Sequence, residues 1–279
     1  MVMQFLCDIF SYSYLQNAVL SALMLGVISG IVGTYVVARR MVFLSGGITH
    51  ASFGGMGLAF YLGFNPLLGA LCMAILSCFA VELSSSRMKV REDSAIGIIW
   101  GVGMALGAFF ISLRPGYTSG DMSSFLFGSI LGLTSTDTIL VLLLMIFLLF
   151  GVAFFGRRVM YVAFDSLFAR SAGVRVLRVG LVMSVVIALT IVLSINMMGI
   201  VLLISLMTIP VVIAEKIVKS YRAIMFVASL TGSLSCFSGL FLSYCLEVPS
   251  GPSIVFVMVA VLLLEKFFLL CRKKHLALR

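Results

Sequence analysis

Charged residues are scarce in this sequence, and that scarcity excludes several classes of protein. Only 10% of the 279 residues are charged, whereas 62% are hydrophobic and the mean hydropathy is +1.24. Soluble domains have about 25% charged and about 45–50% apolar residues, so a soluble globule of this size could not bury so much apolar side chain. A disordered chain would have low hydrophobicity, which this one does not have. A nucleic-acid-binding protein would need basic patches, which in this sequence could lie only between apolar blocks. The composition therefore predicts a protein dissolved mainly in the lipid bilayer, with no nucleic-acid partner.

Motifs that carry catalysis are also missing. The sequence has no Walker A, GxSxG, HExxH or protein-kinase signature, and its 10 acids and 2 histidines lie mostly near the ends of apolar runs. The 6 cysteines show no CxxC spacing, which is typical of buried free thiols. The first charge is Asp8, so a signal peptide's positive region is lacking and we expect the first apolar run to remain as a span. We therefore expect no enzymatic activity and no cofactor in this chain.

Long uncharged runs predict an all-α, polytopic transmembrane helix bundle. About 20 residues cross the hydrocarbon, which gives about eight or nine spans in one integral-membrane domain, residues 1–279. The run 179–214 would be about 54 Å long as one helix, so we expect a turn at Ile195–Gly199. Residues 122–136 are short and broken by glycine, which favours a half-helix or interfacial segment. The expected spans are 15–38, 41–64, 66–84, 94–113, 137–155, 179–195, 199–214, 223–246 and 252–271.

The basic residues distinguish the two sides of the membrane. The net charge is +9, and almost every Lys and Arg falls in alternate loops or in the C-terminal tail. By the positive-inside rule these segments are cytoplasmic, which places the N-terminus outside and the C-terminus in the cytoplasm. This topology puts Arg39, Lys89, Arg170, Lys219 and Arg272 in the cytoplasm, and Asp121 and Glu247 outside.

Glycines recur on one face of two expected spans. Small residues let helix backbones approach closely where lipid supplies no hydrophobic drive. The spacing therefore predicts tight packing along Gly26, Gly30 and Gly33 in the first span, and along Gly97, Gly101, Gly103 and Gly107 in the fourth.

His50 is the only histidine inside an expected span. Counted from the start of that span, it lies about 13–15 Å deep, near the midplane. Two glycine pairs flank it, Gly46-Gly47 and Gly54-Gly55. An ionisable residue at this depth suggests a functional site, and imidazole suits zinc and several other transition metals. The residue alone fits equally well a histidine that hydrogen-bonds a neighbouring helix for packing.

The stretch 164–174 predicts a short helix in a cytoplasmic loop. Asp165 is a favourable N-cap, and Gly173 suits the position just past a helix end. The helix between them is apolar at Leu167, Phe168 and Ala169. Such a helix could dock in a groove of a soluble partner, or lie as an amphipathic helix on the lipid surface.

Four segments in this order resemble the motifs of one family. They are Ser45–Gly57 with its His-Ala-Ser, Asp165-x3-Ala169-x3-Gly173, Gly199–Pro210, and Leu242–Tyr244 followed by Pro249–Val255. In these segments, and over nearly its whole length, the chain resembles the membrane permeases of the ABC-type zinc/manganese/iron importers, the ABC-3 family. The resemblance implies an ATP-driven importer that moves a divalent metal ion into the cytoplasm across the inner membrane of a bacterial cell.

The resemblance also implies partners and roles. We expect a homodimer with a central pathway, an ABC ATP-binding subunit on the cytoplasmic side, and an extracytoplasmic metal-binding protein. The segment 164–174 would be the coupling helix that docks on the ATPase, through Asp165, Leu167, Phe168, Ala169 and Gly173. His50, with Thr49, Ser205 and Thr208, would line the path of the metal. For Ser205 and Thr208, ordinary helix hydrogen bonding is the competing explanation.

One departure from the family pattern bears on the metal. Many members have an Asp four residues before the histidine, where this sequence has Gly46. Residues at i and i+4 share a helix face, so the carboxylate and imidazole would hold a cation together. Without that carboxylate the site has fewer hard oxygens, which favours zinc over manganese or iron.

Two other kinds of transporter compete with this interpretation. A proton- or sodium-coupled metal transporter needs several buried carboxylates. The acids near spans all lie close to their ends: Glu82, Asp137, Glu215, Glu247 and Glu265. The permease of a haem, cobalamin or iron-chelate importer is generally longer, with more spans. The short chain and His50 argue against it.

Overall fold

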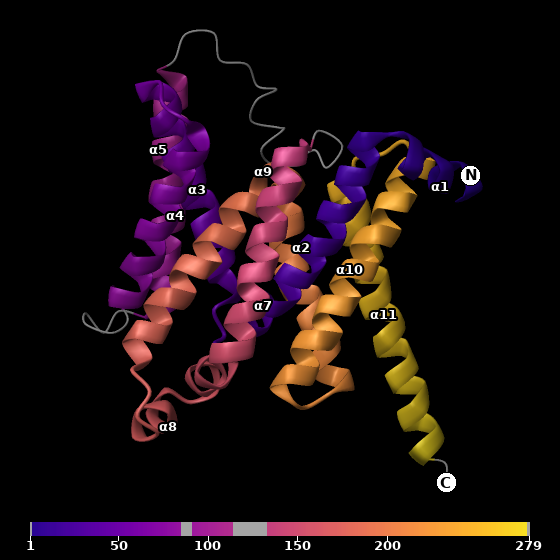
Figure 1. Ribbon diagram of the computed structural model, residues 1–279. Coiled ribbons are helices and arrows are strands. Elements are labelled where there is room, and N and C mark those ends of the chain that lie inside the picture. The colour runs from indigo at the N-terminus through magenta and orange to yellow at the C-terminus, as the bar shows by residue number, and fades with distance from the viewer. Residues whose placement is uncertain (1, 85–90, 114–132, 278–279) are drawn as a thin grey trace.

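The computed structural model describes residues 2–84, 91–113 and 133–277, which are almost entirely helical (Figure 1). Seven helical segments there are long and apolar enough, by length and composition, to cross a membrane. The expected all-α membrane bundle is confirmed. The helices are α1 (Val2–Ser11), α2 (Ser13–Ala38), α3 (Val42–Leu62), α4 (Pro66–Leu83), α5 (Glu92–Ser112), α7 (Ser135–Phe164), α8 (Ser166–Ser171), α9 (Val176–Ile217), α10 (Tyr221–Leu246) and α11 (Ser250–Ala277).

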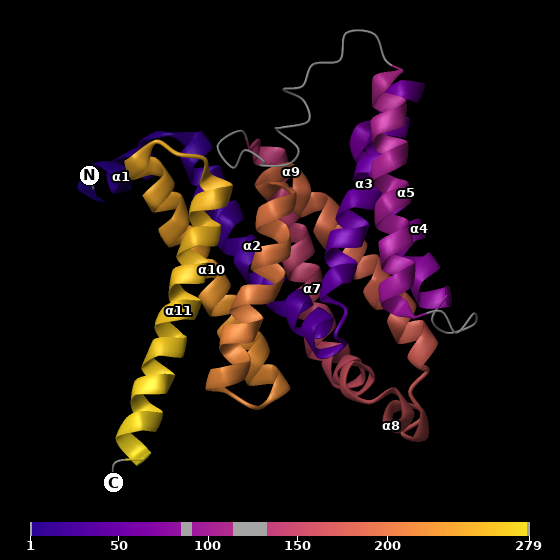
Figure 2. The ribbon, with the colours of Figure 1, turned by 180° about the vertical axis from the view of Figure 1, so that it is seen from behind.

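The turn expected between residues 195 and 199 is present, at Gly199. This residue has φ 72° and ψ 171°, a non-helical conformation inside α9 that is open mainly to glycine. The chain reverses there, so the two arms of α9 run in opposite directions (Figures 1 and 2). The expected spans 179–195 and 199–214 correspond to these arms.

The two ends of the chain lie on opposite sides of the helix bundle, as expected if the chain crosses the membrane an odd number of times. In Figure 1 the N-terminus lies at the top of the bundle and the C-terminus at the bottom. The short helix α8 lies at the same end as the C-terminus, as the charge pattern predicts for two cytoplasmic segments (Figure 1).

The expected span 137–155 is too short. Helix α7 has 30 residues and continues through Arg157 and Arg158 to Phe164, because no glycine turn or proline stops it. At 1.5 Å per residue it is about 45 Å long, longer than the hydrocarbon core. It therefore holds α8 beyond the membrane-spanning part of the bundle. The expected half-helix 122–136 lies mostly outside the described residues.

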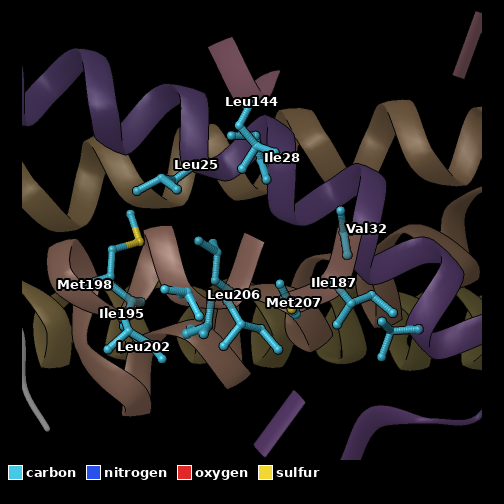
Figure 3. Close-up of a cluster of buried hydrophobic side chains, with 14 of the residues drawn as sticks. Leu25, Ile28, Val32, Leu144, Ile187, Ile195, Met198, Leu202, Leu206 and Met207 are labelled. Atoms are coloured by element: carbon cyan, nitrogen blue, oxygen red, sulfur yellow. The ribbon is translucent and has the colours of Figure 1, made fainter. Parts of the chain in front are cut away.

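Helix α2 lies at the centre of the bundle, and most of its membrane-spanning part is buried among the other helices. Its Leu25 and Ile28 are almost inaccessible to solvent and belong to the buried apolar cluster that also contains Leu206 and Met207 of α9 (Figure 3). On another face, a Cβ atom added at Gly26 would lie 2.4 Å from the backbone nitrogen of Ser233 in α10. The glycine face predicted in the first span is thus a real packing surface.

The glycine face of α5 is only half confirmed. A Cβ atom added at Gly103 would lie 2.4 Å from the Cα atom of Ala51, and one at Gly107 would meet the Phe53 ring, so α5 packs tightly on α3. Gly97 and Gly101 meet nothing within 4 Å in the described part of the chain. Among the described residues, their half of the face is therefore open.

Candidate functional site

His50 lies near the middle of α3, and its side chain is half-buried against α5. Its Nδ1 atom lies 3.0 Å from Sδ of Met104. Its ring stacks on the indole of Trp100, with 4.4 Å between ring centroids and 15° between planes. The close glycine packing between α3 and α5 is what brings these three side chains together.

The histidine lies beside the open part of α5. Gly97, Trp100, Gly101 and Met104 recur at helical spacing, and we call them the α5 stripe. Helix α5 packs mainly on α3, and the two stand with α4 at one side of the molecule (Figures 1 and 2). Trp100 keeps 37% of its surface exposed. Ionisable residues in membrane spans face protein or a water-filled cavity rather than lipid. The face carrying His50 and the α5 stripe is therefore suited to meeting water or a second polypeptide.

Gly46 lies beside Trp100 and Ile204. A Cβ atom added at Gly46 would lie 3.3 Å from Cζ3 of Trp100 and 3.4 Å from Cδ1 of Ile204. A side chain at this position would therefore require the indole ring to shift by a few tenths of an ångström. Across the residues described here, no group of three His, Cys, Asp or Glu side chains could hold a metal ion. A metal at His50 would need donors of another kind.

Two of the three predicted hydroxyl ligands donate hydrogen bonds within their own helices. Thr49 is buried, and its Oγ1 donates to the carbonyl of Ser45 at 2.6 Å. The half-buried Thr208 donates from Oγ1 to the carbonyl of Ile204 at 2.9 Å. Ser205 is half-buried on the second arm of α9. The hydroxyl protons of Thr49 and Thr208 are therefore used in hydrogen bonds within their own helices.

The expected short helix in the stretch 164–174 is present as α8. The Oδ1 atom of Asp165 accepts hydrogen bonds from the backbone N–H groups of Leu167 at 2.8 Å and Phe168 at 3.0 Å, so Asp165 is the N-cap. Gly173 has φ 75°, the left-handed conformation expected just past a helix end. Ala169 is buried in a small cluster with Val162 and Val176. This cluster fixes α8 against the ends of α7 and α9.

The two large apolar side chains of α8 point outward. Leu167 is 74% exposed and Phe168 is 53% exposed. One edge of the Phe168 ring packs on Tyr161 of α7, with 5.4 Å between centroids and 89° between planes. The arrangement is a capped, anchored helix that presents a rigid apolar knob, Leu167 and Phe168.

Two acids near the span ends are held in ion pairs. Lys216 Nζ lies 3.0 Å from Glu265 Oε2, and Arg39 Nη2 lies 3.9 Å from Glu82 Oε2. The glutamate side chains are only 11% and 12% exposed. Carboxylates paired in this way link neighbouring segments of the bundle. Their pairing argues against a proton-coupled transporter, which would need several buried acids free to carry protons.

Sequence reasoning missed Trp100 and Met104. Both lie in the fourth expected span, and only their position opposite His50 gives them significance. The one available signal was the spacing of Gly97 and Gly101, which marks the same face of the helix.

Known proteins similar to this chain cover nearly all of it. A probable metal transport system membrane protein of Chlamydia pneumoniae is 35% identical over 90% of this chain and 87% of its own length. A manganese transport system membrane protein of Halalkalibacterium halodurans is 30% identical over 95% of this chain and 90% of its own. The solved structure of PsaBC from Streptococcus pneumoniae in complex with Fab has a chain that matches with a TM-score of 0.84 and 27% identity, over 95% of both chains. The sequence model of the ABC 3 transport family matches residues 11–269, and this chain therefore belongs to that family.

Proposed function

We propose that this chain is the membrane permease subunit of an ATP-driven importer that moves a divalent metal ion, zinc in the first place, into the cytoplasm. The single observation that carries the proposal is His50, a half-buried imidazole in the middle of a membrane helix, in a chain whose relatives are named as metal transport membrane proteins. The transporter resides in a bacterial inner membrane, with the N-terminus outside and the C-terminus in the cytoplasm.

The pathway lies between two copies of this chain. A divalent cation is very costly in hydrocarbon, so it needs a wet route with a few weak ligands. The face formed by His50 and the α5 stripe supports this arrangement, because a second copy would shield the imidazole from lipid and leave Gly97 and Gly101 room for close approach. An extracytoplasmic metal-binding protein delivers the ion at the outer mouth.

Energy comes from a separate ABC ATP-binding subunit, since this chain has no nucleotide-binding motif of its own. We propose that the knob formed by Leu167 and Phe168 inserts into a groove on that subunit. Because the Asp165 cap and the buried Ala169 make α8 rigid, a movement of the ATPase would be passed on to α7 and α9.

Manganese is the main competitor as substrate, since relatives from Halalkalibacterium halodurans and Streptococcus gordonii are named as manganese permeases. The chemistry around His50 favours zinc, because imidazole suits zinc while carboxylate and water suit manganese, and the residue four positions before His50 is Gly46 rather than an acid.

Metal accumulation by cells that express the chain together with its ATP-binding subunit tests this function. We expect zinc uptake that disappears when the Walker A lysine of the ATP-binding subunit is replaced, and that falls strongly in His50→Ala. Uptake that persists without a functional ATPase would instead support a proton- or sodium-coupled carrier. Accumulation of manganese but no zinc would correct the metal and leave the importer intact.

A further inference from the structure

The sulfur atom of Met104 faces the imidazole of His50 across the α3–α5 contact. The Sδ atom lies 3.0 Å from Nδ1, and the two residues are 54 positions apart in the sequence. A thioether sulfur is only a weak hydrogen-bond acceptor. The contact therefore orients Nδ1 toward the sulfur but gives this nitrogen only a weak hydrogen-bond partner.

From this geometry we propose that His50 and Met104 form a two-atom cation site, Nδ1 and Sδ, which selects softer divalent metals over manganese. The inference rests on the proposed function and names a second ligand for it. Imidazole and thioether donors suit zinc and softer ions, and manganese has the lowest affinity of the common first-row divalent metals for such donors.

The separation of the two donors is close to what a shared metal requires. With bonds of about 2.0 Å to nitrogen and about 2.3 Å to sulfur, a tetrahedral angle at the metal would place the donors about 3.5 Å apart. The observed 3.0 Å needs an opening of a few tenths of an ångström. An unbranched methionine side chain can supply that movement by rotation about its own bonds.

Trp100 is the apolar neighbour of the two donors. Its ring stacks on His50 and lies beside Gly46, so it orients the imidazole plane and supplies no ligand atom of its own. The site is also half-exposed, with two protein donors, so water or the second copy completes the coordination. Two ligands bind weakly enough to release the ion, which a transport pathway requires.

The test compares zinc with manganese accumulation in cells that carry the chain and its ATP-binding subunit. Met104→Leu keeps a similar volume and removes the sulfur. We expect it to lower zinc uptake at limiting zinc about tenfold, equivalent to about 1.4 kcal/mol, and to leave manganese uptake unchanged. Met145→Leu is the matched control, since Met145 is also half-buried but lies in α7. It should behave as wild type.

Met104→Glu separates a change of selectivity from simple damage. A carboxylate in place of the thioether should move the ratio of zinc to manganese uptake toward manganese, which a misfolded protein cannot do. Wild-type ratios in both Met104 variants would overturn the inference, and a continued loss of uptake in His50→Ala would then leave the proposed function standing. Absence of metal uptake by the wild-type complex would refute the proposed function and the inference together.

Discussion

The apolar knob of α8 yields a sharp prediction for the complex with the ATP-binding subunit. Replacing Phe168 by Asp should leave the permease folded and inserted but prevent its co-purification with the ATPase. The side chain is 53% exposed, and its ring packs edge-on against Tyr161. Loss of such an aromatic contact costs about 0.5–1.5 kcal/mol, which a folded helix bundle tolerates.

The cost to the complex is larger. Full burial of a Leu or Phe side chain contributes about 1.5–3 kcal/mol, and about half of the Phe168 surface remains to be covered on docking, so its loss removes about 1 kcal/mol. An aspartate carboxylate in an apolar groove adds a desolvation penalty of several kcal/mol unless it finds a partner. The sum predicts at least a hundredfold weaker complex, since 1.4 kcal/mol corresponds to a factor of ten.

The assay is affinity purification of the tagged permease from detergent, with the amount of bound ATPase measured beside metal uptake. Ser171→Asp is the matched control, because it adds the same charge to an exposed position of α8 while leaving the knob intact. Wild-type recovery of the ATPase with Phe168→Asp would refute the docking of this helix. If, in addition, the segment lost its association with the membrane, α8 would be a lipid-surface helix instead.

Three further predictions follow from the packing and the charge pattern. Gly26→Val should lower the thermal unfolding midpoint in detergent, because its side chain collides with the α10 backbone. Gly151→Val in α7, where an added Cβ atom meets nothing within 4 Å among the described residues, should leave the midpoint unchanged, and equal effects would contradict the packing described here. Lys216→Met should destabilise the chain by about 3–5 kcal/mol, because the mostly buried Glu265 carboxylate loses the cation that pairs with it. The double variant Lys216→Met with Glu265→Leu should regain most of that stability, which thermal unfolding of both variants would show. A single cysteine at Arg170, in a background without native thiols, should resist an impermeant thiol reagent added outside the cell, and labelling from outside would reverse the topology.

Local patterns in the sequence were sufficient for the spans and for several helix ends. Uncharged runs of about 20 residues locate membrane helices because the hydrocarbon thickness sets their length. Helix α4 begins at Pro66, the first residue of the expected span 66–84, and the Asn65 side chain before it accepts a hydrogen bond from the backbone N–H of Leu67. Asp165 and Gly173 delimit α8 in the same way, since capping depends on residues within a few positions of each other. The same local rules failed for the end of α7, where arginines inside a helix resemble the start of a loop.

The sequence alone thus determined the class of protein and the turn at Gly199, and it singled out His50 as a candidate site residue. It could not determine what faces His50. Helical spacing shows which residues share a face, but not which helix meets that face, and the Met104 and Trp100 side chains reach His50 only because α3 and α5 approach closely at Gly103 and Gly107. The tertiary structure therefore decided that the neighbours of the histidine are a sulfur atom and an indole ring, since contacts between distant segments depend on packing that no local pattern encodes.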